Sequence, residues 1–180
     1  PCPCLRRGCR FCPGNRERGF IFTDDLDSKL NTIDYMANLQ ELMVSRGVSV
    51  ENFLITDPVC CPSRTTILRG QYTHNHQVFN NTPPNGGFQK FKETGILNST
   101  LGSWMQAAGY RTALMGKFLN AYPYSDDREY VPPGWSEWVS HAKNIPYDGY
   151  DFVLNENGTL VAYPPEHTNH FTDVLSRKAN

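Results

Sequence analysis

Short apolar bursts and one stretch of helical periodicity organise the first third of the chain. Residues 20–22 are apolar and run into an acidic segment, which predicts a buried strand followed by a loop. Apolar residues recur at helical spacing over residues 32–46, and Gly47 supplies a stop, so a helix is expected there. Residues 48–55 regain strand character before a turn at 56–58.

A second helix is expected to begin near Pro62, because proline in the first helical turn forfeits no hydrogen bond. Residues 65–68 continue this helix and Gly70 ends it. Residues 71–97 are rich in Asn, Pro and Gly and are predicted to be mainly loop.

Thr100 has the position of an N-cap for a helix that Gly109 ends. Residues 110–115 are predicted to form a further buried strand. Residues 122–165 are turn-rich and aromatic, which suits a surface excursion that lines a cleft. Alternating strands and helices of this kind predict an α/β sandwich with a largely parallel sheet.

Candidate functional residues follow the ends of the predicted strands. Asp24 and Asp25 come after the first strand, Cys60 after the second and Lys117 after the third. In α/β sheets of this type, ligands collect at the carboxyl ends of the strands. We therefore expect these four side chains to share one site.

Composition and charge exclude several classes of protein. The chain has 180 residues, enough for one domain with a hydrophobic core, and its net charge is -1. Lys and Arg are scattered, so nothing indicates nucleic-acid binding. The chain has no apolar run of about 18 residues, so no membrane span is expected. The N-terminal residues also lack the apolar core of a secretory signal peptide.

Four cysteines crowd the first twelve residues, at positions 2, 4, 9 and 12. They could form a small zinc site or a disulfide knot. However, no second ligand cluster follows at zinc-finger spacing, and residues 1–18 have no apolar periodicity to fold around a metal. We therefore interpret residues 1–18 as a disordered or non-native leader.

Cys60, Pro62, Ser63 and Arg64 form the most informative motif of the chain. The dipole and free N–H groups of a helix N-terminus favour a thiolate, so a reactive cysteine or an anion site is plausible on physical grounds. A buried cysteine pair before a proline-started helix would explain the proline, but neither Ser63 nor Arg64. A cysteine phosphatase would need a longer loop between its cysteine and arginine.

The run from Cys60 to Arg64, with Leu68 and Gly70, resembles the signature of the sulfatase family. The resemblance implies an alkaline-phosphatase-like sandwich with a mostly parallel central sheet, of which residues 19–180 would form the N-terminal portion. It also implies that Cys60 is oxidised to formylglycine by a formylglycine-generating enzyme. One hydroxyl of the hydrated aldehyde would attack sulfur, and the other would then expel sulfate and regenerate the aldehyde.

The same resemblance assigns the remaining site residues. Asp24 and Asp25 resemble an acidic pair that, with the modified Cys60, binds Ca²⁺ or another divalent cation. Lys117, in a Gly-Lys element, would contact the substrate sulfate. Many members carry a histidine two or three positions after this lysine; here Asn120 could donate a hydrogen bond instead. Arg64 would pair with oxyanion oxygens.

Longer matches resemble the N-acetylglucosamine-6-sulfatase branch, which includes heparan 6-O-endosulfatases. They lie at residues 71–76, 116–122 and 131–135, in addition to the cysteine motif. The implied reaction removes 6-O-sulfate from N-acetylglucosamine in glycosaminoglycans, in a lysosomal, extracellular or periplasmic location. Sequons at Asn80, Asn98 and Asn157 permit a glycoprotein on a secretory route.

Two alternatives remain open at the level of the sequence. A phosphonate or phosphate monoester hydrolase of the same fold would use the same modified cysteine, because phosphate and sulfate are near-isosteric. A catalytically incomplete fragment or binding module is the other, because further metal ligands and a downstream histidine and lysine of the family would lie beyond Asn180.

Overall fold

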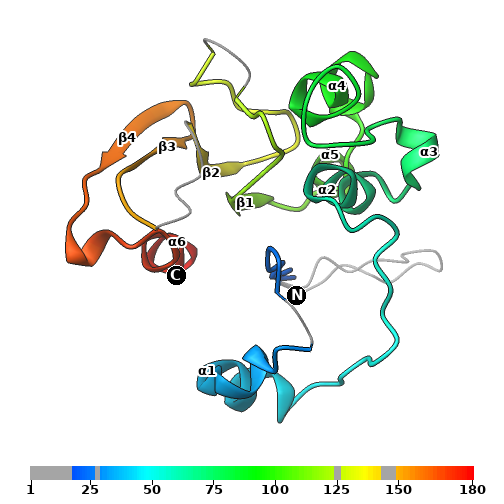
Figure 1. The fold of residues 1–180 in the computed structure, drawn as a ribbon. Coiled ribbons are helices and arrows are strands. Elements are labelled where there is room, and N and C mark those ends of the chain that lie inside the picture. The colour runs from blue at the N-terminus through cyan, green and yellow to red at the C-terminus, as the bar shows by residue number, and fades with distance from the viewer. Residues whose placement is uncertain (1–17, 27–28, 124–126, 143–148) are drawn as a thin grey trace, which may run out of the picture. The chain divides into compact units, whose positions relative to one another are not determined.

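The computed structural model describes residues 18–26, 29–123, 127–142 and 149–180, which divide into an N-terminal unit up to Glu51 and a C-terminal unit from Asn52 (Figure 1). The cysteines at positions 2, 4, 9 and 12 lie outside the described residues.

The N-terminal unit contains a run of helical turns, as the periodicity predicted. They are a 3-10 turn at Thr32–Tyr35, helix α1 at Ala37–Leu39 and a π-helical turn at Gln40–Val44. The Gly47 amide closes the run by donating to the carbonyl of Met43 at 2.7 Å. The predicted helix is therefore confirmed in position, although its hydrogen-bonding pattern changes along its length.

The strands predicted at residues 20–22 and 48–55 are wrong for this structure. Neither segment forms a strand, and the side chains of Ile21 and Leu54 are 77% and 86% exposed. An apolar burst predicts burial, but a strand also requires a neighbouring strand to pair its N–H and C=O groups. Among the described residues, no strand pairs with either segment.

The C-terminal unit begins with helices that the sequence partly predicted. Their bounds are Cys60–Arg69 for α2, Thr73–His76 for α3, Gly87–Glu93 for α4 and Leu101–Ala107 for α5, with a 3-10 turn at Ile96–Asn98. Gly70 ends α2 in the left-handed conformation, and Thr100 is the N-cap residue of α5, as expected; its amide donates to Oγ of Ser103 at 2.8 Å.

The prediction that residues 71–97 are mainly loop is wrong for α4. Phe88 and Phe91 on this helix are buried and join the core. The glycines and prolines around it disguised a helix that tertiary burial of two aromatic side chains stabilises.

Within the described residues, four strands form one sheet in the order β1-β2-β3-β4. They span Ala113–Gly116, Glu137–His141, Phe152–Glu156 and Thr159–Tyr163. β1 and β2 are parallel, whereas β2–β3 and β3–β4 are antiparallel, so the described sheet is mixed. A 3-10 turn at His167–Asn169 and helix α6 at Phe171–Ala179 follow.

The prediction of a surface excursion over residues 122–165 is also wrong, because this stretch contains three of the four strands that the structure describes. Polar residues at buried positions hid them. Ser140 and Asn155 are fully buried inside β2 and β3 and interrupt the apolar pattern that predicts a strand.

Alternating side chains of the sheet face two separate cores. Leu114 and Trp138 contribute to a core that also receives residues of α2 and α4. Met115 and Val139 contribute to a core that includes Val174 of α6. Helices thus cover both faces of the sheet, which confirms the α/β fold class.

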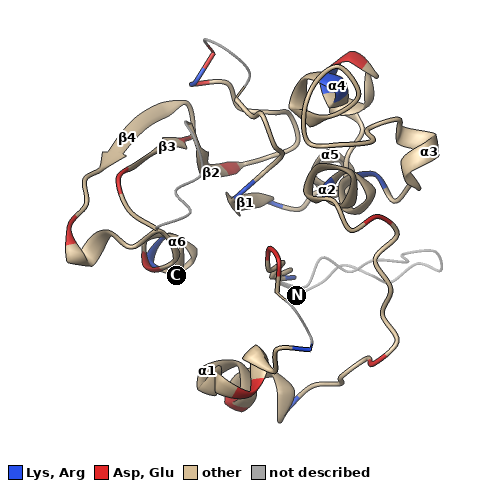
Figure 2. Cartoon of the chain, viewed as in Figure 1, with Lys and Arg blue, Asp and Glu red and all other residues tan. Residues whose placement is uncertain are grey.

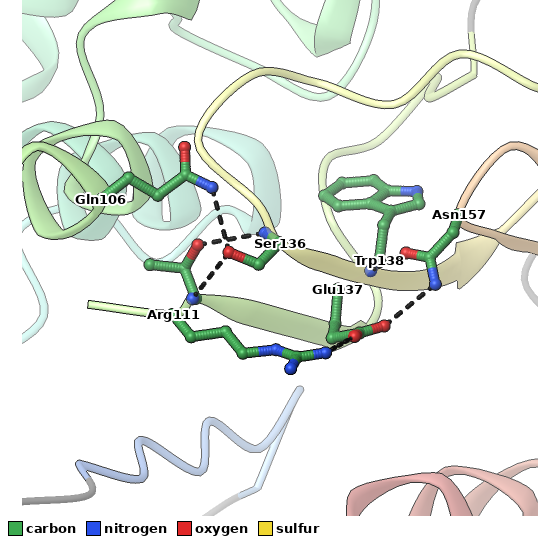
Figure 3. Close-up of polar contacts among 7 residues, drawn as sticks. Gln106, Arg111, Ser136, Glu137, Trp138 and Asn157 are labelled. Atoms are coloured by element: carbon green, nitrogen blue, oxygen red, sulfur yellow. Dashed lines mark hydrogen bonds and ion pairs between the residues drawn. The ribbon is translucent and has the colours of Figure 1, made fainter. Parts of the chain in front are cut away.

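Polar contacts hold the start of β2 beside the start of β1 (Figure 3). Arg111 and Glu137 form an ion pair, and the Ser136 amide donates to the carbonyl of Thr112 at 2.8 Å. Asn157 accepts from the Trp138 amide at 2.7 Å and donates to Glu137 at 2.9 Å. These contacts accompany the parallel pairing in which Ala113 lies opposite Glu137.

Charged residues are distributed over several elements, with both signs interspersed (Figure 2). Within the described ranges, no helix combines the length and the apolar character that a membrane crossing demands.

Candidate functional site

Cys60 is the first residue of α2 and follows Val59, whose backbone is extended. Pro62 lies in the first turn, where its missing N–H needs no partner. The Cys61 amide in the same turn donates to Oδ1 of Asn81 at 2.8 Å. Asn81, from the loop before α4, therefore caps the helix that presents Cys60.

The two adjacent cysteines differ sharply in environment. Cys60 is half-buried, whereas Cys61 has no exposed surface. Burial raises the pKa of the Cys61 thiol to about 11, although hydrogen bonds from the Asn120 and Gly87 main chain oppose this shift. Cys61 thus has the environment of a structural side chain that joins α2 to residue 120, and Cys60 is the more accessible thiol.

Arg64 links α2 to the residues that follow β1. Its side chain is buried, and Nη1 donates to the carbonyl of Lys117 at 2.6 Å and to that of Phe118 at 3.5 Å. A guanidinium can serve two carbonyls because its N–H groups fan out in one plane. Two of the predicted site residues are thereby joined directly.

Helix α4 fixes the position of Asn120. The Phe88 amide donates to the Asn120 carbonyl at 2.8 Å. Gly87 has a φ of +72°, and a Cβ at this position would lie 3.0 Å from the carbonyl oxygen of Asn81, so glycine permits this close approach. Oδ1 of Asn120 is buried and has no hydrogen-bond partner among the described residues.

His141 lies at the carboxyl end of β2 and is buried. Burial lowers the pKa of its imidazole to about 4, and the positive charges of Lys117 and Arg64 act in the same direction. The register of β1 and β2, which pairs Gly116 with Ser140, places His141 beside Lys117.

Asp24 and Asp25 belong to the N-terminal unit, and both are exposed. Asp25 has a φ of 54°, so the pair occupies a turn that presents two consecutive carboxylates. The structure thus places Cys60, Arg64, Lys117 and Asn120 in the C-terminal unit, where Arg64 contacts Lys117, and the acidic pair in the N-terminal unit.

Sequence reasoning missed Asn81 and His141. Asn81 acts through a cap that reaches 20 positions along the chain, and His141 is one polar residue in a strand that was not predicted. His76 is also buried; its Nδ1 accepts from the Val78 amide at 3.2 Å and its Nε2 lies 3.2 Å from Thr66 Oγ1.

The chain is similar to proteins of a known family. The model of the family described as Sulfatase matches residues 20–178. An arylsulfatase of Volvox carteri is 38% identical over 88% of this chain and 24% of its own length. N-acetylglucosamine-6-sulfatase of Homo sapiens is 34% identical over 87% of this chain and 29% of its own length. An extracellular sulfatase SULF-1 homolog of Drosophila melanogaster is 33% identical over 87% of this chain.

The chain spans less than a third of the length of these relatives, between 13% and 29%. Among solved structures, a protein in complex with its substrate D-glucosamine-2-N,6-O-disulfate matches 72% of this chain and 22% of its own, with 23% identity and a TM-score of 0.49.

Proposed function

This chain belongs to the sulfatase family, and from that premise we propose that it carries the nucleophile of a sulfuric ester hydrolase. Cys60 is the residue proposed to become formylglycine. Its half-exposed position supports this choice, because a maturation enzyme and a substrate must both reach it, whereas Cys61 is fully buried. Once formed, the hydrated aldehyde supplies one hydroxyl that attacks sulfur and a second that drives release of sulfate.

The hydrogen bond from Arg64 to the Lys117 carbonyl is the observation that carries the proposal. It connects the helix that bears Cys60 with the segment that bears Lys117 and Asn120. In the proposed reaction, Lys117 neutralises a sulfate oxygen and Asn120 donates a hydrogen bond to the substrate. Arg64 contributes positive charge beside the oxyanion while holding the main chain of Lys117.

The proposed substrate is 6-O-sulfated N-acetylglucosamine in glycosaminoglycans. The names of the relatives support this class, since they include an N-acetylglucosamine-6-sulfatase and an extracellular sulfatase. An extracellular or lysosomal location, or a periplasmic one, and maturation by a formylglycine-generating enzyme belong to the same proposal.

Asp24 and Asp25 are the proposed ligands of a divalent cation. Their carboxylate oxygens are hard donors and fit Ca²⁺ or Mg²⁺, whereas the thiol of unmodified Cys60 is soft and does not. Conversion of Cys60 to formylglycine replaces sulfur by oxygen and makes the third donor compatible with the same ion. The cation would supply charge neutralisation at the sulfate group.

Peptide mass spectrometry tests the nucleophile. The chain is produced in a host that contains a formylglycine-generating enzyme, and the peptide that includes Cys60 is measured. The expected result is the mass of the aldehyde at Cys60 and an unmodified Cys61. An unmodified Cys60 in that host would overturn the proposal.

Substrate preference is tested with the converted protein. We expect release of sulfate from 6-O-sulfated N-acetylglucosamine and none from a Cys60→Ala variant. Cys61→Ala serves as the matched control, because it also removes one thiol but leaves the proposed nucleophile. Faster hydrolysis of the corresponding phosphate or phosphonate ester would instead favour the alternative hydrolase of the same fold.

A further inference from the structure

His141 is a buried histidine beside the proposed site that neither the motifs nor the proposed reaction uses. It ends β2, and Lys117 directly follows β1. The two strands are parallel, with Gly116 paired to Ser140. Lys117 follows Gly116, and His141 follows Ser140. Because the strands are parallel, Lys117 and His141 are therefore neighbours at the carboxyl edge of the sheet.

The His141 imidazole contacts Tyr122, which lies five positions after Lys117 in the chain. His141 donates a hydrogen bond to the main chain of Tyr122, and the two rings meet edge to face with centroids 5.7 Å apart. Nδ1 lies 3.4 Å from Oγ of Ser140. The side chain is 3% exposed, so its contacts are with protein rather than solvent.

The 117–122 segment, defined as residues 117 to 122, is thus held at several points. Arg64 holds the carbonyl of Lys117, the Phe88 amide holds that of Asn120, and His141 holds the main chain of Tyr122. Lys117 and Asn120, the two proposed sulfate-binding residues, both belong to this segment.

The chemistry of histidine suits this position. Lys117 and Arg64 are the charged groups that face the imidazole, and with burial they keep it neutral at pH 7. A third cation would repel them, and a carboxylate would cancel the positive charge that an oxyanion needs. A neutral imidazole still donates one hydrogen bond, which an aliphatic side chain of similar size cannot.

We propose that His141 is a positioning residue of the oxyanion site, which holds the 117–122 segment through Tyr122 so that Lys117 and Asn120 meet one sulfate group together. This inference rests on the proposed function, because it assigns the sulfate group to those two residues. It adds His141 of β2 to the site as a residue that acts on Lys117 and Asn120 through the main chain of the 117–122 segment.

Two measurements on the whole chain test the inference. Hydrogen exchange reports the order of the 117–122 segment, and calorimetric titration with inorganic sulfate reports the affinity of the site. The variants are His141→Leu, which removes the donor, His141→Asn, which retains a donor, and His141→Phe, which retains ring packing alone. Tyr163→Phe is the control, since it removes a hydrogen bond to Glu156 in β3.

For His141→Leu we expect faster exchange at residues 118–122, unchanged exchange in β4, and sulfate affinity lowered about tenfold, as loss of one buried hydrogen bond implies. His141→Asn is expected to restore most of the affinity. His141→Phe should behave like His141→Leu, and it carries the test if the leucine variant fails to fold.

Unchanged sulfate affinity in His141→Leu and His141→Phe would overturn the inference, as would an equal loss in Tyr163→Phe. Lys117→Ala separates this result from a failure of the proposed function. Sulfate affinity that survives Lys117→Ala overturns the proposed site itself, and the inference with it. If Lys117→Ala abolishes sulfate binding while His141→Leu leaves the affinity unchanged, only the role of His141 is overturned.

Discussion

Nη1 of Arg64 donates a hydrogen bond to the main-chain carbonyl of Lys117 over 2.6 Å, between residues 53 positions apart. The arginine of the cysteine motif therefore builds the site as well as bearing charge in it. Its partner is a main-chain oxygen, so the contact depends on how the chain folds after β1 and on no particular side chain at position 117.

Replacement of Arg64 by alanine is expected to lower the free energy of unfolding by about 2–4 kcal/mol, because a buried side chain is truncated and the carbonyls of Lys117 and Phe118 lose their donor. Arg64→Lys should recover only part of this loss, since an ammonium lacks the planar fan of donors. Urea denaturation measures both. Arg111→Ala is the matched control: its side chain is 77% exposed, so a much smaller loss is expected. Equal losses would contradict the structural role assigned to Arg64.

Replacement of Asn81 by alanine is expected to cost about 1 kcal/mol, because the Cys61 amide in the first turn of α2 loses its cap. Asn81→Asp retains the acceptor and should preserve stability. Thermal unfolding gives the comparison, with Asn98→Ala as an exposed asparagine control. If Asn81→Asp were as unstable as Asn81→Ala, the cap would not be the cause.

Stability is expected to fall in alkali through Cys61. Its pKa is raised from 9.0 to about 11 in the fold, so the unfolded thiol loses its proton first. The contribution of Cys61 is complete below pH 9 and is lost as the pH rises towards 11, by about 2–3 kcal/mol. The free energy of unfolding is measured against pH for the wild type and for Cys61→Ala, and the difference between the two curves isolates the contribution of Cys61. A difference that does not vary over this range would contradict the buried environment of the thiol.

Stability is also expected to fall in acid through His141. Its pKa is lowered from 6.5 to about 4, so between these pH values the imidazole is protonated in the unfolded state and neutral in the folded state. The contribution is complete above pH 6.5 and is lost as the pH falls towards 4, by about 3 kcal/mol. The free energy of unfolding is measured against pH for the wild type and for His141→Asn, and the difference between the two curves gives the contribution of His141. His76, whose pKa is also lowered by burial, contributes in the same direction and remains in both proteins.

Removal of the carboxylates at Asp24 and Asp25 is expected to weaken Ca²⁺ binding at least about tenfold, because each contributes a charged oxygen ligand. Calorimetric titration of the converted protein with Ca²⁺ compares Asp24→Asn and Asp25→Asn with wild type. Asp34→Asn is the matched control, since it removes an exposed carboxylate of the same unit. Equal effects of all three changes would indicate general charge attraction rather than a site.

Local signals predicted the elements that local interactions stabilise. Pro62 and Gly70 mark the ends of α2, and Thr100 and Gly109 those of α5, because caps and left-handed glycines act within a few residues. The strands of residues 137–163 and helix α4 were missed, because their stability comes from burial and pairing with distant segments. The strands predicted at 20–22 and 48–55 failed for the converse reason, since apolar character alone provides no pairing partner.

The sequence by itself determined the chemistry of the site: a Cys-x-Pro-x-Arg motif on a helix and a lysine after a strand. The tertiary structure decided which cysteine is accessible, that Arg64 grips the main chain of Lys117, and that Asn81 and His141 belong to the same neighbourhood. Residue type carries the reactive groups, whereas hydrogen bonds to main-chain atoms arise from chain geometry. Such hydrogen bonds do not depend on the side chain of the accepting residue, so the residue type at that position does not predict them.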